Sequence, residues 1–376
     1  MSKYVLIPDS YKGTLSSGTI CRVMAEEIRA QEPEAEIISI PVADGGEGTV
    51  EAFLSAVGGQ RVEVPCKGPY LEEIQGYFAM LPGDIAVVEM AVAAGLPLVS
   101  ERRDPTATTT YGVGQLIAAA LERGARQIIL GLGGSATNDG GCGAAAALGA
   151  EFRDAAGELF IPTGGTLGKI AAISTAHMHP LVREVPFTAM CDIDNPLCGK
   201  NGASAVFGPQ KGADAAMVAR LDMGLRHLAS VVARDLHLDI LDLPGSGAAG
   251  GFGGGSVAFF NSALRMGIDI VLDITHFDRA AKNADLILTG EGKLDSQSLR
   301  GKVVIGVARR AKPLGVPVAA LVGGSETDLT AAYAEGVSGV FPINPLPLPF
   351  EEVCDHAEDN LRFTVRNLIH YTRVWR

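Results

Sequence analysis

Strand and helix patterns alternate at the beginning of this chain. An apolar run at residues 4–10 precedes a segment that Ser16 or Ser17 can cap as a helix through about Arg29. A second apolar run follows at residues 36–43. A helix that joins two strands carries the chain back to the end of the sheet where the first strand began. The second strand therefore runs parallel to the first.

The C-terminal part of the chain repeats this alternation. An α/β fold with an open, mostly parallel sheet of Rossmann or flavodoxin-like type is therefore predicted, with helices on both faces. The predicted strands lie at 284–290, 317–324 and 339–343, and the predicted helices at 303–312, 330–335 and from about 350.

The middle of the chain has its own α/β elements. We interpret residues 66–284 as a second α/β domain inserted into the first, which comprises residues 1–65 and 285–376. The central strands are predicted at 85–91, 127–134 and 187–196, and the helices at 114–123 and 141–149.

Composition limits the class of partner and the compartment. The formal net charge of −12 disfavours a nucleic-acid or anionic-membrane surface, which carries a basic excess. Six scattered cysteines without C-x-x-C spacing indicate reduced thiols. No signal peptide and no membrane-spanning apolar run is found in the sequence, which predicts a soluble, cytoplasmic protein.

Polar residues and glycines follow four of the predicted strands. Ligands of open α/β sheets bind at the carboxyl ends of the strands, so these residues are expected at one edge. Helix caps and tight turns explain each segment taken alone. The residues of interest are Asp9, Ser10 and Lys12 after the first strand, Asp44 after the second, Lys293 and Asp295 after a later one, and residues 323–325 after another.

A glycine-rich turn at residues 131–141 follows a strand and precedes an Ala-rich helix. Glycines let the backbone approach a ligand, and the N–H groups of such a turn favour phosphate. Gly133, Gly134, Ser135 and Thr137 are therefore predicted to cradle phosphate groups. A purely structural turn is the alternative.

Three further segments are of interest, and two of them allow two interpretations. Asp192 and Asp194 end a strand and are placed to orient a hydroxyl or hold Mg²⁺, whereas an Asx turn before Pro196 is the structural alternative. Lys211 puts a cation in a turn. Residues 245–255 form either a flexible linker or a loop that feeds a helix at about 256–267 and cradles an anion.

Absent motifs narrow the choice of enzyme class. The P-loop pattern G-x-x-x-x-G-K-[ST], the protein-kinase motifs and G-x-S-x-G do not occur, and no zinc-type histidine spacing is present. Residues 245–250 formally match G-x-G-x-x-G, which leaves an NAD-dependent hydroxy-acid oxidoreductase as a remote alternative.

Taken together, six segments resemble the bacterial type I glycerate kinase family, in order and along essentially the whole chain. Ser246 stands where this family typically has Gly. The segments are residues 5–12, 43–49, 131–141, 191–197, 207–213 and 289–298.

The resemblance implies transfer of the γ-phosphoryl group of ATP to D-glycerate, usually giving 2-phosphoglycerate, with Mg²⁺ as cofactor. Phosphoryl transfer needs cations and a carboxylate that accepts the hydroxyl proton. Asp192 is the preferred base, and Asp44 and Asp295 are alternative bases or Mg²⁺ ligands. The other candidates are Lys12 as a catalytic cation and Asp9, Ser10, Lys211 and Lys293 for substrate binding.

The sequence leaves several points open. Phosphorylation of the 3-hydroxyl, or of another small hydroxy acid, is the nearest alternative. Differences of less than one ångström in the position of the substrate decide which of two neighbouring hydroxyls reacts, and no motif reports them. A regulator that binds glycerate or nucleotide without turnover would lack the acidic residues found here. A homodimer is also left open, and closure of the two domains over the substrates is expected.

Overall fold

The computed structural model describes residues 1–43, 45–296, 298–346 and 349–374. Its internal contacts divide the chain into two compact units. Unit 1 contains Met1–Ala43, Glu51–Val57 and Met266–Arg376, and unit 2 contains Asp44–Val50 and Gly58–Arg265. The boundaries thus lie near residues 57 and 265, whereas the sequence pattern places them at 65 and 284.

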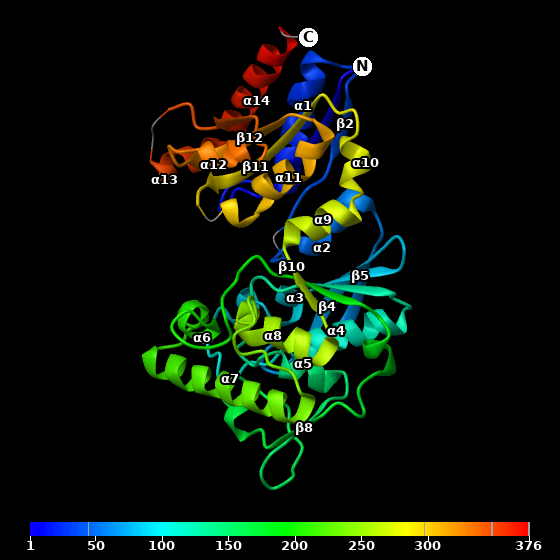
Figure 1. Ribbon diagram of the computed structural model, residues 1–376, viewed down its shortest axis with the longest axis vertical. Helices are drawn as coiled ribbons and strands as arrows, with labels where there is room; N and C mark the ends of the chain where they lie inside the picture. Colours follow the sequence, from blue (N-terminus) through cyan, green and yellow to red (C-terminus); the bar gives the residue numbers. More distant parts are fainter. Residues whose placement is uncertain (44, 297, 347–348, 375–376) are drawn as a thin grey trace. The chain divides into compact units, whose positions relative to one another are not determined.

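Unit 1 contains a five-stranded parallel sheet in the order β13-β12-β11-β1-β2. Figure 1 labels its strands β2, β11 and β12. Counted along the chain, this order is 2-1-3-4-5, which is flavodoxin-like, and the winding direction reverses between β1 and β11. The predicted fold class is confirmed. The strands are β1 (Lys3–Pro8), β2 (Glu36–Ser39), β11 (Leu286–Leu294), β12 (Val318–Ser325) and β13 (Gly339–Pro342).

Helices cover the sheet of unit 1, so the central strands are buried and read as nearly continuous apolar runs. The first helix begins at Ser17, and the Ser16 side chain accepts a hydrogen bond from the N–H of Thr19, which confirms the predicted cap. The helices are α1 (Ser17–Gln31), α2 (Thr49–Val57), α9 (Gly267–Ile274), α10 (Phe277–Ala281), α11 (Val303–Ala311), α12 (Thr330–Ala334), α13 (Phe350–Val353) and α14 (Ala357–Arg373).

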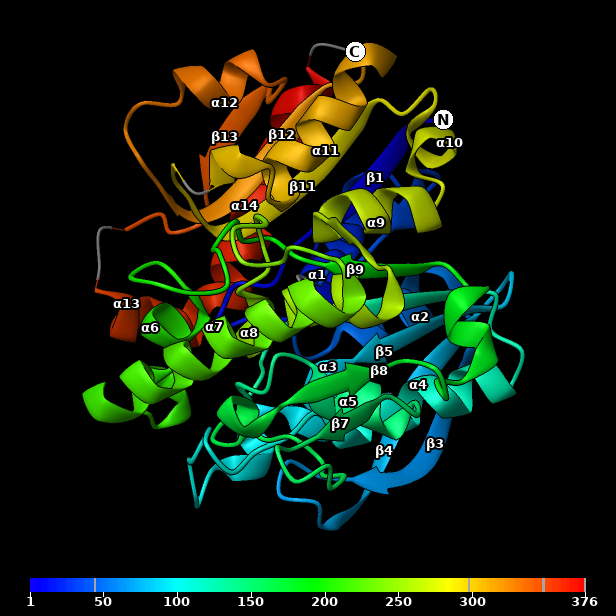
Figure 2. The same cartoon turned by 60° about the horizontal axis from the view of Figure 1, so that its bottom comes forward.

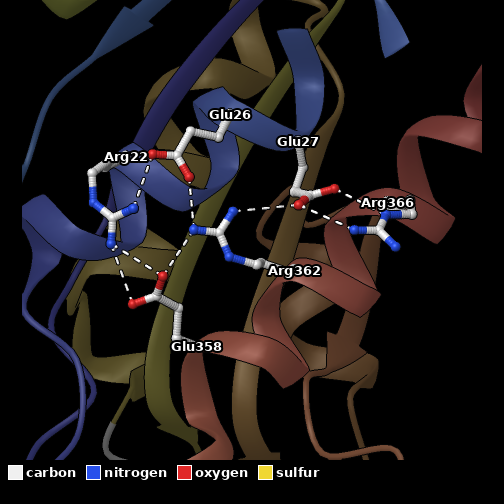
Figure 3. A network of polar contacts seen from close by, with 6 residues as sticks. All are labelled: Arg22, Glu26, Glu27, Glu358, Arg362 and Arg366. Atoms are coloured by element: carbon white, nitrogen blue, oxygen red, sulfur yellow. Dashed lines mark hydrogen bonds and ion pairs between the residues drawn. The ribbon is translucent and has the colours of Figure 1, made fainter. Parts of the chain in front are cut away.

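Helices α1 and α14 lie side by side and share an apolar cluster with β1, β11 and β12. A network of ion pairs joins the two helices (Figure 3). Arg362 of α14 lies 2.7 Å from Glu26 and 3.4 Å from Glu27, both on α1. Arg366 adds a 3.0 Å contact to Glu27, and Arg22 contacts Glu358 at 3.2 Å. The last helix is thus tied to the first by packing and by charge.

Unit 2 contains a six-stranded mixed sheet in the order β10-β9-β6-β5-β4-β3 and a separate β7-β8 pair. The pairs β3-β4 and β4-β5 are antiparallel, whereas β5, β6, β9 and β10 run parallel. The strands are β3 (Gln60–Lys67), β4 (Glu73–Leu81), β5 (Ile85–Glu89), β6 (Gln127–Gly131), β7 (Glu151–Arg153), β8 (Ala172–Ser174), β9 (Phe187–Met190) and β10 (Ala263–Arg265).

Helices of unit 2 pack on this sheet and on one another, with α4 against β3 and α5 (Figure 2). In the part of the chain that the structure describes, no helix combines the length and the apolar composition needed to cross a membrane. The helices are α3 (Met90–Ala94), α4 (Tyr111–Glu122), α5 (Cys142–Ala147), α6 (Ala203–Phe207), α7 (Ala215–Leu236) and α8 (Ala248–Phe260).

The expected convergence of four polar segments on one sheet edge is only partly right. Strand β2 ends at Ser39, earlier than predicted, and residues 45–50 belong to unit 2. There the N–H of Gly133 donates to the carbonyl of Gly45 at 2.8 Å. This segment therefore contributes to the glycine loop of unit 2 rather than to the sheet edge of unit 1.

The glycine-rich segment at 245–255 is half turn and half helix. Ala249, Gly250 and Gly251 have left-handed backbone angles, and regular helix runs only from Phe252 to Phe260. The predicted helix at 256–267 is wrong beyond that point, since residues 263–265 form β10 beside β9. The glycines inside the helix allow close packing: a Cβ on Gly255 would lie 2.0 Å from the carbonyl oxygen of Gly140.

Candidate active site

The glycine loop after β6 is the most tightly organised polar part of unit 2. The N–H of Ala136 donates to the carbonyl of Ala94, and the N–H of Leu96 donates to the carbonyl of Gly134. A Cβ on Gly133 would lie 2.5 Å from the Cα of Gly46, so only glycine fits this approach. The loop is thus held between the end of α3 and the segment 45–50.

Lys211 lies beneath this loop, with 1% of its surface exposed. Its Nζ donates to the Ser135 hydroxyl at 2.7 Å and to the Thr137 carbonyl oxygen at 2.6 Å. Burial lowers the pKa of this ammonium to about 7. The structure thus brings together three predicted site residues, Ser135, Thr137 and Lys211, and ties the lysine to the loop.

Asp139 anchors the other end of the loop and was missed by the sequence reasoning. Its fully buried carboxylate accepts hydrogen bonds from the backbone N–H and hydroxyl of Thr110, both at 2.8 Å, and from the N–H of Gly143 at 3.1 Å. Further donors are the Thr109 hydroxyl and the N–H of Gly141. Burial raises the pKa of Asp139, and these donors oppose the rise.

Two buried hydroxyls around the loop have no hydrogen-bond partner among the described residues. They are Thr137 Oγ1 and Ser246 Oγ, and both residues are fully buried. The segment that follows Ser246 approaches the loop closely, since Gly140 donates its N–H to the carbonyl of Gly250 at 3.1 Å. Buried hydroxyls are normally satisfied, so unpaired ones mark a place where a polar ligand or water completes the structure.

Glu89 lies at the end of β5 and also escaped the sequence reasoning. Its carboxylate accepts the N–H groups of Gly48 and Val50, each at 3.2 Å, at the start of α2. Only 2% of the residue is exposed, and burial raises its pKa to about 7.

Asp44, a predicted base and Mg²⁺ ligand, lies outside the described residues.

Unit 1 presents a second polar group where β1 ends beside β11. Pro8 pairs with Gly290 in register, so Asp9 follows β1 at the level of Glu291, which lies within β11, at the reversal of winding where such sheets bind ligands. Asp9 accepts the N–H of Ser10 at 2.7 Å. Glu291 is 6% exposed, and its Oε1 has no partner among the described residues.

The charges at this sheet edge act on one another. The pKa of Glu291 is raised to about 7, mainly by burial, with further contributions from Asp9 and Asp295. Lys293 lies 3.9 Å from Asp295, and its side chain is 66% exposed. Lys12 is also exposed. The structure therefore gathers predicted residues here around Glu291, a carboxylate to which the sequence reasoning assigned no role.

The remaining predicted base, Asp192, lies in unit 2 directly after β9 and is half-buried. Its neighbour Cys191 donates its N–H to the carbonyl of Arg265 at 2.8 Å, which continues the β9-β10 pairing. The predicted residues thus divide between the two units. Gly133, Gly134, Ser135, Thr137, Asp192 and Lys211 belong to unit 2, and Asp9, Ser10, Lys12, Lys293 and Asp295 to unit 1.

The residues that sequence reasoning missed are buried polar groups inside apolar or glycine-rich runs. The only signal for Glu291 and Glu89 is a carboxylate within or at the end of an otherwise apolar strand, and burial is not visible in the sequence. The G-x-G-x-x-G interpretation of residues 245–250 finds no support, because no described strand lies between α7 and this segment.

These features define the class of the protein: an α/β protein whose glycine loop, buried lysine and unpaired hydroxyls are suited to bind an oxyanion. The profile of the glycerate kinase family matches residues 4–373. The chain therefore belongs to the glycerate kinase family, which confirms the resemblance drawn from the sequence.

Individual relatives and a solved structure agree with this assignment. The chain is 43% identical over 376 residues to a glycerate kinase of Bacillus cereus, covering 100% of this chain and 98% of that protein. It is 42% identical over 368 residues to the glycerate 2-kinase of Escherichia coli, covering 97% of each. A crystal structure of a protein provisionally named glycerate kinase 2 from Salmonella typhimurium LT2 matches with a TM-score of 0.87 at 42% identity, covering 99% of this chain and 98% of that one.

Proposed function

We propose that this protein transfers the γ-phosphoryl group of ATP to the 2-hydroxyl of D-glycerate and releases 2-phosphoglycerate and ADP. Membership of the glycerate kinase family over residues 4–373 supports the reaction class, and the relative named glycerate 2-kinase supports the hydroxyl. The structural observation that carries the proposal is the buried ammonium of Lys211 bonded to Ser135 and Thr137 of the glycine loop. Phosphate groups are the natural ligands of such a loop.

The nucleotide phosphates are assigned to Gly133, Gly134, Ser135 and Thr137. The backbone of this loop, at residues 133, 134 and 136, is held by hydrogen bonds to residues 45, 96 and 94, so the loop is organised before a ligand arrives. Phosphoryl transfer depends on positioning and charge stabilisation more than on covalent chemistry by the protein. A preorganised loop supplies the positioning because little conformational entropy is lost on binding.

D-Glycerate is assigned to the polar groups at the strand ends. Asp9 and Ser10 would bind its hydroxyls, and the exposed cations Lys12 and Lys293 would neutralise its carboxylate or the transferring phosphoryl charge. Asp192 is proposed as the base that accepts the hydroxyl proton, since its half-buried carboxylate follows a parallel strand. The predicted contact of Lys211 with substrate stays a prediction.

Mg²⁺, when bound, would neutralise negative charge on the phosphate groups. In the described ranges, no three His, Cys, Asp or Glu side chains are placed to share a metal ion. Mg²⁺ of kinases needs only one or two carboxylates besides phosphate oxygens and water. Oε1 of Glu291 has no partner among the described residues, and Asp295 is close enough to influence the pKa of Glu291, so these two residues would hold the ion. The role of Asp44 as a Mg²⁺ ligand stays a prediction.

The test is an assay of ADP release in the presence of D-glycerate and MgATP. ADP formation that requires both D-glycerate and Mg²⁺, with no reduction of NAD, is the expected result. Lack of turnover by a folded protein that binds ATP would contradict it. A cytoplasmic location, a homodimer and the absence of nucleic-acid and membrane partners stay predictions.

A further inference from the structure

Lys211 is a buried cation whose partners are neutral oxygens. Its ammonium donates to the Ser135 hydroxyl and the Thr137 carbonyl oxygen. In the described part of the chain, no carboxylate lies within ion-pair distance of this ammonium. Burying a cation is costly unless an opposite charge accompanies it.

The acidic residue that influences Lys211 is Asp139, and its carboxylate is already occupied. Asp139 raises the pKa of Lys211 by its charge, against the larger effect of burial. Its oxygens accept hydrogen bonds from Thr110, from Gly143 and from two other donors. The negative charge of Asp139 is thus already stabilised by these donors, and it does not pair directly with the ammonium of Lys211, whose pKa burial lowers to about 7.

The loop above Lys211 also has an unused donor. Thr137 Oγ1 is buried and has no partner among the described residues, while the carbonyl of the same residue accepts from Lys211. Ser246 Oγ is a second unpaired hydroxyl. A positive charge and free hydroxyls are both complementary to one kind of ligand, an oxyanion.

Hydrogen bonding alone does not require a lysine at this position. A neutral amide can donate to a hydroxyl and a carbonyl oxygen without the desolvation of a charge. What only the ammonium adds is the charge itself. That charge acts strongly on a phosphate bound to the loop, because the loop is buried and water screens it weakly.

We propose that Lys211 is a positioning residue whose ammonium fixes the loop at residues 133–137 and whose charge is balanced by a phosphate group of the nucleotide bound there. This inference rests on the proposed function. Lys211 acts through Ser135 and Thr137 and need not touch the nucleotide. Its role thus differs from the contact with glycerate predicted from the sequence.

The test uses K211M and K211Q, which remove the charge, and K211R, which keeps it. K200M is the matched control, because Lys200 is exposed. ADP binding is measured by isothermal titration calorimetry in the presence of EDTA, and folding by the melting temperature. We expect K211M and K211Q to bind ADP roughly ten- to hundredfold more weakly, from the loss of one charge at an effective dielectric constant of about 20.

The melting temperatures separate a binding role from a structural one. K211M is expected to melt close to the wild-type temperature without ligand, because relief from the buried charge offsets the loss of the two hydrogen bonds to Ser135 and Thr137. K211R is expected to retain more affinity than K211Q, and K200M to match the wild type. If K211M does not fold, K211Q tests the same charge.

Two results would overturn the inference. Wild-type affinity for ADP in the folded neutral variants would show that the charge is not used. Weakened binding of 2-phosphoglycerate, with unchanged binding of ADP, would assign the phosphate to the product rather than the nucleotide. Failure of the wild type to bind ADP or to phosphorylate glycerate would instead contradict the proposed function.

Discussion

Buried ionisable residues carry much of the chemistry of this protein. Lys211 and Glu89 in unit 2 and Glu291 in unit 1 each have a pKa moved to about 7 by burial. Groups that titrate near neutral pH are common at functional sites, because the same desolvation that costs stability makes them responsive to ligands. Their contribution to stability therefore depends on pH.

Glu89 gives a testable pH dependence. Its pKa is raised from 4.5 to about 7, so the folded protein binds more protons than the unfolded chain between these values. Stability from this group is fully present below pH 4.5 and is lost as the pH rises through 7. This pKa shift corresponds to a cost of about 3 kcal/mol for holding the buried carboxylate charged at high pH. An amide in its place removes that cost but loses one hydrogen bond, which is worth about 1 kcal/mol.

Glu89→Gln should therefore unfold with a free energy about 2 kcal/mol higher than wild type at pH 8, and with little or no advantage at pH 4.5. Urea unfolding of both proteins at the two pH values checks this. An equal difference at both values would show that the carboxylate does not titrate in this range.

Asp192 tests the assignment of the base. Asp192→Asn keeps the size of the side chain but cannot accept the hydroxyl proton, so kcat should fall by about 100-fold or more while the dissociation constant of ADP stays near the wild-type value. Asp84→Asn, at an exposed position in the turn between β4 and β5, is the control. An unaltered kcat would remove the assignment and leave Asp44 and Asp295 as the next candidates.

At the scale of elements, the left-handed turn before the regular part of α8 fixes the glycine loop. Gly250 has φ +66°, and a Cβ at this position would lie 2.0 Å from the Thr137 carbonyl oxygen. Gly250→Ala should destabilise the protein by about 2–4 kcal/mol, from backbone strain and overpacking. Gly168→Ala is the control, because nothing lies within 4 Å of a Cβ there. Equal urea midpoints for the two variants would contradict this account.

The ion pairs between α1 and α14 give a second element-scale prediction. Glu27 is 7% exposed and contacts both Arg362 and Arg366. Glu27→Gln should lower the unfolding free energy by roughly 1 kcal/mol, and Glu26→Gln, at a more exposed carboxylate, by less. The difference from wild type should shrink in about 1 M salt, where charges are screened within about 3 Å. A salt-independent difference would point to packing instead.

Elements were more predictable from the sequence than the contacts between them. The runs that became β1, β6 and β11 are apolar and bounded by glycine or aspartate, so their existence followed from periodicity. The glycines at 253–255 were misleading, because tertiary packing against Gly245 and Gly140 overrides the low helix propensity of glycine. The pairing of Lys211 with Ser135 joins residues 76 positions apart, which no local pattern reveals.

At the scale of the whole molecule, the fold class follows from the alternation of elements, and the family from motifs spread over the chain. The placement of residues 45–50 with unit 2 could not be predicted, because the segment comes only a few residues after β2 of unit 1. Asp44 illustrates the same limit. Its motif suggests a carboxylate that acts as a base or a Mg²⁺ ligand, but the motif does not show which residues lie beside that carboxylate. Function was therefore easier to predict than the roles of single residues.

The central claim is a chemical one, that MgATP and D-glycerate are converted into 2-phosphoglycerate. ³¹P and ¹H NMR of the products, with a control that lacks glycerate, tests it most directly, because the phosphorus coupling reports which carbon bears the phosphate. We expect 2-phosphoglycerate and ADP in equal amounts, and no phosphoglycerate in the control. Formation of 3-phosphoglycerate would contradict the assigned hydroxyl, and the absence of any phosphoglycerate from folded, ATP-binding protein would contradict the proposed function itself.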